Sequence, residues 1–359
     1  MSPTVHLHIG EPKTGTTYLQ SMLFHHQEQL AESGVLVPGR NLDHIRAGHD
    51  ALGRSKTAGT HATEGAWQSL ADEIMAADAE HAVVSMEMLT RARPPQAARA
   101  VAAFGDRADV RVVVTTRELS RLVPARWQES VQFRKSWTLD EYSAGVFESG
   151  RVREAGPSKH FWGLHDTPVT VDTWGRAVGI ERITVVTLPP SGAAPDVLWT
   201  RFGEAIGVDL ANYSEAEQAN ASLGAASAEV MRRLNLLLAE SDLGDAEHAR
   251  ICRKFLGKTV LPEIKSTEPS ITLPASQREA AGALSRQLAD ELQRTQVRVV
   301  GDLAGLLPPD TSSDQAPAPN DSQVAAAALT ALAAIVEQNA RLSKAARKRG
   351  RDLPFTEVE

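Results

Sequence analysis

A short loop rich in glycine and threonine, near the start of the chain, carries the residues best suited to chemistry. It reads "GEPKTGTTYLQ" from Gly10 and follows the apolar stretch "TVHLHI". Between a strand and a helix, such a loop points backbone N–H groups and the positive end of the helix at an anion. Gly10 and Gly15 have the spacing of the ATP-binding loop G-x-x-x-x-G-K-[ST], but the next residue is Thr16 and the lysine is Lys13, inside the loop. We therefore expect an anion site whose cation is placed differently from that of an ATPase.

A second cation follows the apolar stretch "VRVVVTT", which begins at Val110. It is Arg117, and Glu118 comes directly after it. An NTPase places at such a strand end an acidic residue that holds Mg²⁺. An arginine in front of the acid favours neutralisation of the anion by the protein's own cations, with no bound metal.

The two segments resemble the two signatures of sulfotransferases that use 3′-phosphoadenosine-5′-phosphosulfate (PAPS). "PKTGTTY", from Pro12 to Tyr18, is similar to the family's 5′-phosphosulfate-binding loop, Pro-Lys-Ser/Thr-Gly-Thr-Thr followed by an aromatic residue. The strand that ends before Arg117 resembles the segment that binds the 3′-phosphate. The family places a serine eight residues after this arginine, where this chain has Ala125, and Ser120 is a nearer hydroxyl.

The resemblance implies a donor and a set of contacts. It covers roughly residues 5–309 and implies PAPS as the donor and 3′,5′-ADP as the product. Lys13 would stabilise the leaving phosphate oxygen, and Tyr18 would lie against the adenine. The acceptor would be a hydroxyl group of a sugar or another small molecule. The residues that the resemblance places at the donor are Pro12, Lys13, Thr14, Gly15, Thr16, Thr17, Tyr18, Arg117 and Ser120.

Two residues are candidates for the general base that the acceptor hydroxyl needs. Glu87 follows the apolar stretch "AVVSM", at a strand end, where open α/β sheets build their sites. Its neighbours Met86 and Met88 provide the apolar surroundings that suit a base. His49, in "RAGHDAL", is the second candidate, because it lies in an irregular stretch that could close over the site.

The elements that must position these residues alternate along the chain. Helical segments rich in Ala and Leu separate four apolar, β-branched stretches, which begin at Val5, Ala82, Val110 and Ile183, and the stretch from Val297 is either a late strand or only the end of the fold. This pattern predicts an α/β fold with a central, mainly parallel sheet covered on both faces, a three-layer fold of the P-loop type. Residues 41–65 and 149–168 lack a regular pattern, and we expect them to be long loops that shape the acceptor pocket.

A linker and a helical tail are expected after the α/β domain. The domain should span residues 1–309, a linker rich in Asp, Ser and Pro residues 310–322, and a C-terminal helix with a basic end residues 323–359. The helix is either a solvated appendage or a surface for self-association or partner docking. The residues expected on its apolar face are Val324, Ala328, Leu329, Leu332, Ile335, Val336 and Leu342.

Composition limits the partners. The chain has 359 residues and a formal net charge of -7, so we expect no nucleic-acid binding. Its one cysteine, Cys252, excludes an internal disulfide and fits a reducing compartment. Neither a secretory signal nor an apolar run of ~20 residues is visible, so we expect a cytoplasmic protein without a membrane span.

Three functions remain open at this point. The first is a PAPS-dependent sulfotransferase that works in-line and without a metal. The second is a small-molecule kinase of the same P-loop architecture, which Thr16 and the missing metal-binding acid disfavour. The third is a non-catalytic nucleotide-binding module whose tail docks a partner.

Overall fold

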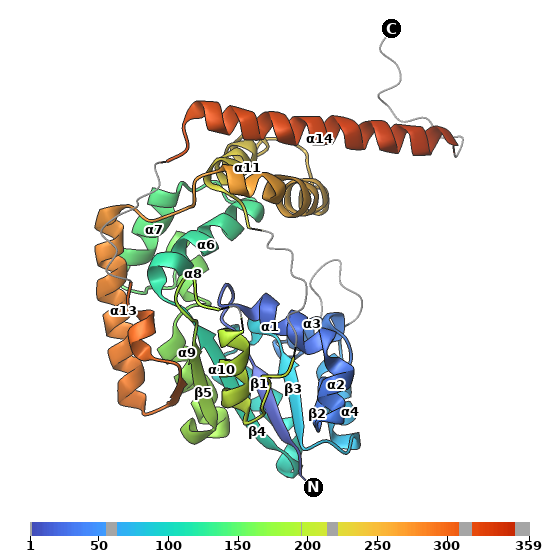
Figure 1. Cartoon of the computed structure of the whole chain (residues 1–359), viewed down its shortest axis with the longest axis vertical. Coiled ribbons are helices and arrows are strands. Elements are labelled where there is room, and N and C mark those ends of the chain that lie inside the picture. The colour runs from blue at the N-terminus through green and yellow to red at the C-terminus, as the bar shows by residue number, and fades with distance from the viewer. Residues whose placement is uncertain (1, 55–62, 195, 214–221, 309–317, 349–359) are drawn as a thin grey trace. The chain divides into compact units, whose positions relative to one another are not determined.

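Parallel strands form the centre of the molecule. The computed structural model describes residues 2–54, 63–194, 196–213, 222–308 and 318–348. Within these ranges six strands form one sheet in the order β2-β3-β1-β4-β5-β6, and every pair is parallel (Figure 1). The strands are β1 (Thr4–His8), β2 (Val35–Leu36), β3 (His81–Ser85), β4 (Asp109–Thr116), β5 (Ile183–Thr187) and β6 (Arg298–Val300). The four expected strands are confirmed, and the stretch from Val297, left open above, contains the strand β6. Strand β2 is an addition, since two residues are too few to show a pattern.

Helices pack on both faces of the sheet, so the expected three-layer α/β fold is confirmed. The helices of one face are α1 (Thr16–His25), α2 (Gln27–Glu32) and α10 (Val197–Ile206). The helices of the other face are α3 (Asn41–Ala51), α4 (Ala66–Ala76), α5 (Pro94–Ala102), α9 (Thr167–Val178) and α13 (Ala275–Thr295). None of the helices within the described ranges is long and apolar enough to cross a bilayer.

The other helical segments are short or lie in the second half of the chain. The short 3₁₀ segments are η1 (Glu87–Arg91), η2 (Gly105–Arg107), η3 (Ile180–Arg182), η5 (Leu261–Thr267) and η6 (Leu303–Leu306), and η4 (Ala249–Val260) is a π-helix. The remaining α-helices are α6 (Leu119–Gln132), α7 (Leu139–Phe147), α8 (Gly156–Trp162), α11 (Ala225–Leu237), α12 (Asp245–His248) and α14 (Asp321–Lys348).

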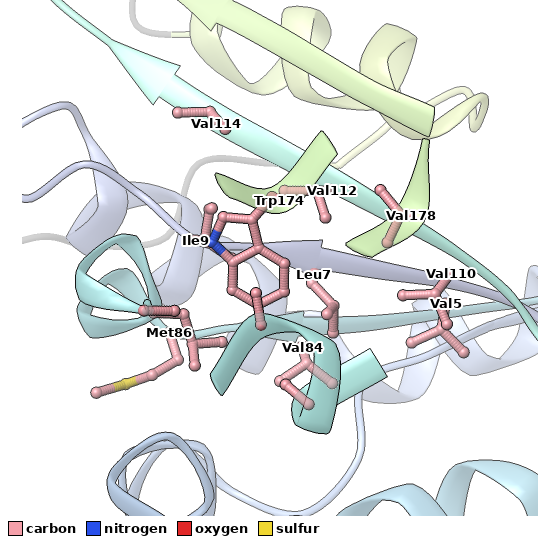
Figure 2. Close-up of a cluster of buried hydrophobic side chains, with 14 of the residues drawn as sticks. Val5, Leu7, Ile9, Val84, Met86, Val110, Val112, Val114, Trp174 and Val178 are labelled. Atoms are coloured by element: carbon pink, nitrogen blue, oxygen red, sulfur yellow. The ribbon is translucent and has the colours of Figure 1, made fainter. Parts of the chain in front are cut away.

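Successive side chains of each strand point to opposite faces of the sheet, so the hydrophobic core has two layers. Val5, Leu7 and Ile9 lie in the cluster that Trp174 of α9 covers (Figure 2). Val113 of β4 lies in the other cluster, together with residues of α1 and α10. Successive side chains of a strand point to opposite faces, so a strand covered on both sides must be apolar nearly throughout. This is why the central strands were readable from the sequence.

Contacts divide the chain into two groups. One group contains the sheet and comprises Met1–Val123, Ser143–Gln218 and Pro274–Ser312. The other comprises Pro124–Tyr142, Ala219–Leu273 and Ser313–Glu359, and its described residues are mainly helical. The boundaries expected at residues 309 and 322 stay a prediction, because grouping by contacts does not test whether a segment folds alone.

Two stretches expected to be long loops contain helices, so that expectation was wrong for much of their length. In the first, α3 buries His44, Ala47, Gly48 and Ala51 at helical spacing. The buried face of this helix consists of small and polar residues, so large apolar residues do not mark its helical period in the sequence. Residues 55–62 of the same stretch lie outside the described ranges.

The second stretch is also partly helical. It contains α8 and the first residues of α9. Phe161 and Trp162 of α8 are fully buried, and two adjacent aromatic residues in a seven-residue helix give no readable period.

The C-terminal helix α14 packs on α11 through its first half. Val324 and Ala327 are buried in one apolar cluster with Val230 of α11. Leu329 and Leu332, also expected on the apolar face, are 65% and 56% exposed. The helix is therefore a packed element of its group, and self-association through its exposed side stays a prediction. The basic residues beyond Lys348 lie outside the described ranges.

Candidate anion-binding and catalytic site

Three neighbouring strands deliver the candidate residues to one edge of the sheet. In the order β3-β1-β4, the central strand β1 pairs in parallel with both neighbours, and His8 lies opposite Ser85 and Val113. Carboxyl ends of parallel strands meet at one edge, and here the chain order changes sides, which is where open α/β sheets bind ligands. Lys13 follows β1, and Glu87 and Arg117 follow the other two strands.

The loop after β1 has an unusual backbone conformation. Gly10, Lys13 and Gly15 have φ angles of 85°, 66° and 80°. A Cβ atom on Gly10 would lie 2.8 Å from the Cβ atom of Glu87, and one on Gly15 would lie 2.3 Å from a methyl group of Leu198. At Gly10 the close atoms include the backbone Cα of Glu87, so both space and φ require glycine, whereas at Gly15 the close atom is the end of a leucine side chain and φ is the reason. Lys13 has no such freedom, and a left-handed residue other than glycine is strain that functional loops often carry.

Hydrogen bonds to β4 hold this loop in place. The Glu11 N–H donates to the Thr115 carbonyl oxygen at 2.7 Å, and the Thr115 N–H donates to the Gly10 carbonyl oxygen at 2.6 Å. The buried Thr14 hydroxyl donates to the Glu11 carbonyl oxygen and lies 2.6 Å from the Thr115 hydroxyl. The Thr14 hydroxyl therefore shapes the loop from within, and contact of Thr14 with the donor stays a prediction.

Helix α1 begins directly after the loop. Gly15 is the N-cap residue, and within the described ranges no side chain caps the helix and no acidic residue lies in its first turn. Its N–H groups and its positive dipole end are thus available to an anion. Thr17 is exposed, Lys13 is partly exposed and Pro12 is buried.

Arg117 lies against the same loop. Its Nη1 atom donates to the Lys13 carbonyl oxygen at 3.3 Å. Its Nε atom is buried without a hydrogen-bond partner among the residues that the structure describes. Burial, and then the nearby Arg121, lower the pKa of Arg117 to about 10, so the guanidinium stays charged at neutral pH. A buried, charged donor with unused capacity beside a phosphate-type loop fits an anionic ligand.

The carboxylate of Glu118 accepts hydrogen bonds from the polar groups that follow Arg117 in the chain. The Ser120 hydroxyl donates to the Glu118 carboxylate at 2.6 Å, and the Arg121 N–H donates to the same oxygen at 2.9 Å. Burial raises the pKa of Glu118, and these hydrogen bonds oppose the rise. Ser120, expected at the 3′-phosphate, already has an acceptor inside the protein.

The two candidate bases have different surroundings. Glu87 begins η1 and its Cα and Cβ atoms are next to Gly10. The Thr16 hydroxyl donates to its Oε2 atom at 2.5 Å, so Glu87 touches both ends of the loop. His49 is partly exposed on α3, a helix that contacts η1, and its buried Nδ1 atom has no partner among the described residues. Contact with the loop favours Glu87.

Tyr18, the residue expected against the adenine, packs against apolar side chains. It borders the cluster that contains Leu19 and Leu198, and it is partly buried. The side chain could offer one face to a ring while the other is packed.

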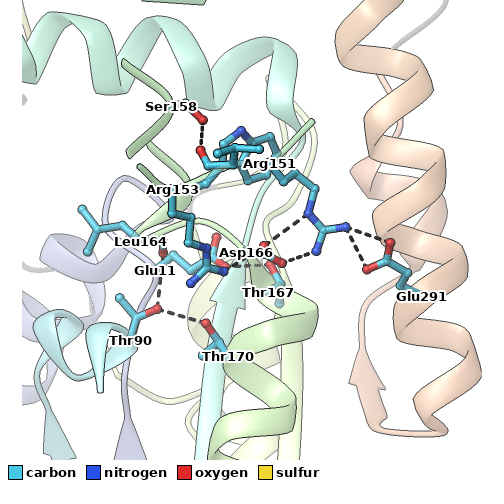
Figure 3. Close-up of polar contacts among 12 residues, drawn as sticks. Glu11, Thr90, Arg151, Arg153, Ser158, Leu164, Asp166, Thr167, Thr170 and Glu291 are labelled. Carbon is cyan, nitrogen blue, oxygen red and sulfur yellow. Dashed lines mark hydrogen bonds and ion pairs between the residues drawn. The ribbon is translucent and has the colours of Figure 1, made fainter. Parts of the chain in front are cut away.

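A buried acidic cluster next to the loop was not anticipated. Glu11 lies inside the loop sequence, and its carboxyl group contacts Thr167, the first residue of α9 (Figure 3). It also lies close to His165, two residues earlier. The only sequence signal was an acidic residue in a loop built for anions. Its partners lie more than 150 residues away, and no local pattern connects them.

Comparisons with known proteins find one solved structure that is distantly similar to this chain. No protein-family model matches the sequence, and no curated protein matches it. Among solved structures, a sulfotransferase from Alicyclobacillus acidocaldarius is similar, with 15% identity and a TM-score of 0.38 over 82% of this chain and 95% of that chain. Neither value is high enough to assign an activity.

Proposed function

We propose that this chain is a sulfotransferase that moves a sulfuryl group from PAPS to a hydroxyl group of a sugar or another small molecule. The observation that carries the proposal is the loop after β1. Its left-handed Gly10, Lys13 and Gly15 precede the uncapped start of α1, and both Glu87 and Arg117 lie against it.

The loop fits the 5′-phosphosulfate of the donor. N–H groups at the start of α1 would bind its oxygens. Transfer breaks the bond between sulfur and the bridging oxygen, and negative charge gathers on that oxygen. Lys13 would stabilise this charge, and a preorganised donor of this kind contributes ~3 kcal/mol to the transition state.

Glu87 would act as the base. It would take the proton of the acceptor hydroxyl while the acceptor oxygen bonds to sulfur, opposite the leaving oxygen. The products would be a sulfate ester and 3′,5′-ADP, and the proton on Glu87 would pass to solvent. The hydrogen bond from Thr16 orients the carboxylate for this step. His49 remains the alternative base.

Arg117 would bind the 3′-phosphate. Its charge and its buried Nε donor support this role. The hydroxyl of Ser120 would have to leave Glu118 to take part, so Arg117 would supply most of the side-chain recognition.

Calorimetric titration tests the proposal against its alternatives. A sulfotransferase should bind 3′,5′-ADP in the presence of EDTA, whereas a kinase should bind ATP only with Mg²⁺. Sulfate-ester formation from PAPS, followed over a panel of sugars and small alcohols, then separates an enzyme from a non-catalytic module. Tight binding of Mg–ATP with no response to 3′,5′-ADP would overturn the assignment.

A further inference from the structure

The buried carboxyl group of Glu11 is out of place in a loop that binds anions. The residue is fully buried, and its neighbours along the chain are Gly10 and Pro12. A negative charge at this point would repel the ligand and would be costly to bury. Burial, the largest effect, raises the pKa of Glu11 to about 8, so the group is mainly neutral at pH 7.

Two side chains at the start of α9 meet this carboxyl group. The Thr167 hydroxyl donates to the Oε1 atom at 2.7 Å, and the Nδ1 atom of His165 lies 3.5 Å from Oε2. The Thr167 hydroxyl is also 2.9 Å from the hydroxyl of Thr116, the last residue of β4. Glu11 is therefore linked by side chains to the strand end that precedes Arg117.

Ion pairs fix the segment that carries the two partners of Glu11 (Figure 3). Asp166, between His165 and Thr167, binds Arg151 and pairs with Arg153 at 2.8 Å. Arg151 also donates to both carboxylate oxygens of Glu291, on α13, at 2.7 and 2.9 Å. The segment 165–167 is thus anchored to other elements.

These contacts and the chain itself form a closed ring of linked residues that joins the loop after β1 to the segment after β4. From Glu11 the ring passes through Thr167 and Thr116 to Arg117, whose guanidinium donates to the Lys13 carbonyl oxygen, two residues from Glu11. We propose that Glu11 is a positioning residue that, through Thr167, sets the place of the loop relative to Arg117. The proposal rests on the function proposed above, since it concerns the two groups assigned to the two phosphate ends of the donor.

Substitutions at both ends of the Glu11–Thr167 contact test the proposal. Glu11→Ala should weaken 3′,5′-ADP binding by at least ~10-fold, because the two segments lose the side-chain link between them and keep only the backbone hydrogen bonds to β4. Thr167→Val should act in the same direction by a smaller factor. Glu11→Gln keeps an oxygen that accepts from Thr167, so it should restore most of the affinity at pH 7.

A matched control separates positioning from general loss of stability. Thr170 is a buried threonine of the same helix, and its hydroxyl contacts Thr90 at 3.3 Å instead of Glu11. Thr170→Val should lower the melting temperature to a similar extent as Thr167→Val but leave nucleotide affinity within about twofold. Equal losses of affinity in both valine variants would show that Glu11 and Thr167 have only a structural role.

The pH dependence of binding gives a second readout. As pH rises through about 8, Glu11 ionises, so wild-type affinity for 3′,5′-ADP should fall, and Glu11→Gln should remove this fall. The charged or titratable groups in the contacts described around Glu11 are His165, Asp166, Arg151, Arg153, Glu291, Lys13 and Arg117, and they are unchanged in the variant. The same pH dependence in both proteins would overturn the proposal.

The test distinguishes failure of this proposal from failure of the proposed function. If the wild-type protein binds no 3′,5′-ADP, the function fails, and amide hydrogen exchange then decides the role of Glu11. Glu11→Ala, but neither Glu11→Gln nor Thr170→Val, should speed exchange in residues 10–18 and 116–121. Unchanged exchange in Glu11→Ala would overturn the positioning role by itself.

Discussion

The two segments proposed to bind the donor, at the end of the sheet, differ in how they are organised. The loop after β1 is shaped by its backbone, through left-handed residues and hydrogen bonds to β4. The segment after β4 depends on the guanidinium of Arg117, because Glu118 already holds the Ser120 hydroxyl and the Arg121 N–H. The first segment would act on the bridging oxygen, where charge develops during transfer, whereas Arg117 would hold the 3′-phosphate, whose charge does not change in the reaction. We therefore expect changes at the first segment to affect turnover, and changes at the second to affect binding of the 3′ end.

The largest effect is expected at Glu87, which touches both ends of the first loop. Glu87→Gln keeps the acceptor oxygen for Thr16 but cannot take a proton, so turnover on a verified acceptor should fall by ~10²–10⁴-fold. Affinity for 3′,5′-ADP, measured by calorimetry, should stay nearly unchanged. The control is His49→Gln, which should raise the KM of the acceptor more than it lowers kcat. Normal turnover in Glu87→Gln, with a large loss in His49→Gln, would move the base to α3.

The next largest effect is expected at Lys13. Lys13→Ala removes the cation of the loop, and turnover from PAPS should fall by ~10²–10³-fold, with weaker PAPS binding as well. Lys13→Arg, which keeps the charge but changes its geometry, should recover only part of the rate. Wild-type turnover in Lys13→Ala would remove the contrast between the two segments, since the first would then contribute no more to catalysis than the second.

A smaller and more selective effect is expected at Arg117. Arg117→Ala should weaken 3′,5′-ADP by roughly ten- to a hundred-fold, because a charge-assisted hydrogen bond contributes ~1.5–3 kcal/mol. Affinity for 5′-AMP, which lacks the 3′-phosphate, should change little. Parallel titrations with the two nucleotides measure the difference, and equal losses would show that Arg117 does not read the 3′ end.

The smallest effect is expected at Ala125, where the resembling family has serine. Because Glu118 engages the nearer Ser120, Ala125→Ser should supply a missing donor and tighten 3′,5′-ADP by about fivefold, which corresponds to one net hydrogen bond of ~1 kcal/mol. Affinity for 5′-AMP is the internal control. No gain, together with a loss in Ser120→Ala, would mean that Ser120 leaves Glu118 when the ligand binds.

Different physical signals explain what the sequence could and could not predict. Strands buried on both faces must be apolar, so β1, β3 and β4 were readable, and with them the edge at which Lys13, Glu87 and Arg117 meet. Helix α3 was missed because its buried stripe contains His44 and Gly48. The ring through Glu11 could not be predicted, since Thr167 lies 156 residues away and only the tertiary structure brings the two together.

The central place of β1 has a consequence for the synthesis of the chain. Strand β1 is synthesised before both of its partners, with which it pairs at His81–Ser85 and Asp109–Val113. Until then its apolar residues, among them Val5, Leu7 and Ile9, have no sheet to join, and pairing over such separations is slow. The candidate anion-binding loop can therefore take its shape only after β4 has been made, because Gly10 and Glu11 are held by hydrogen bonds to Thr115.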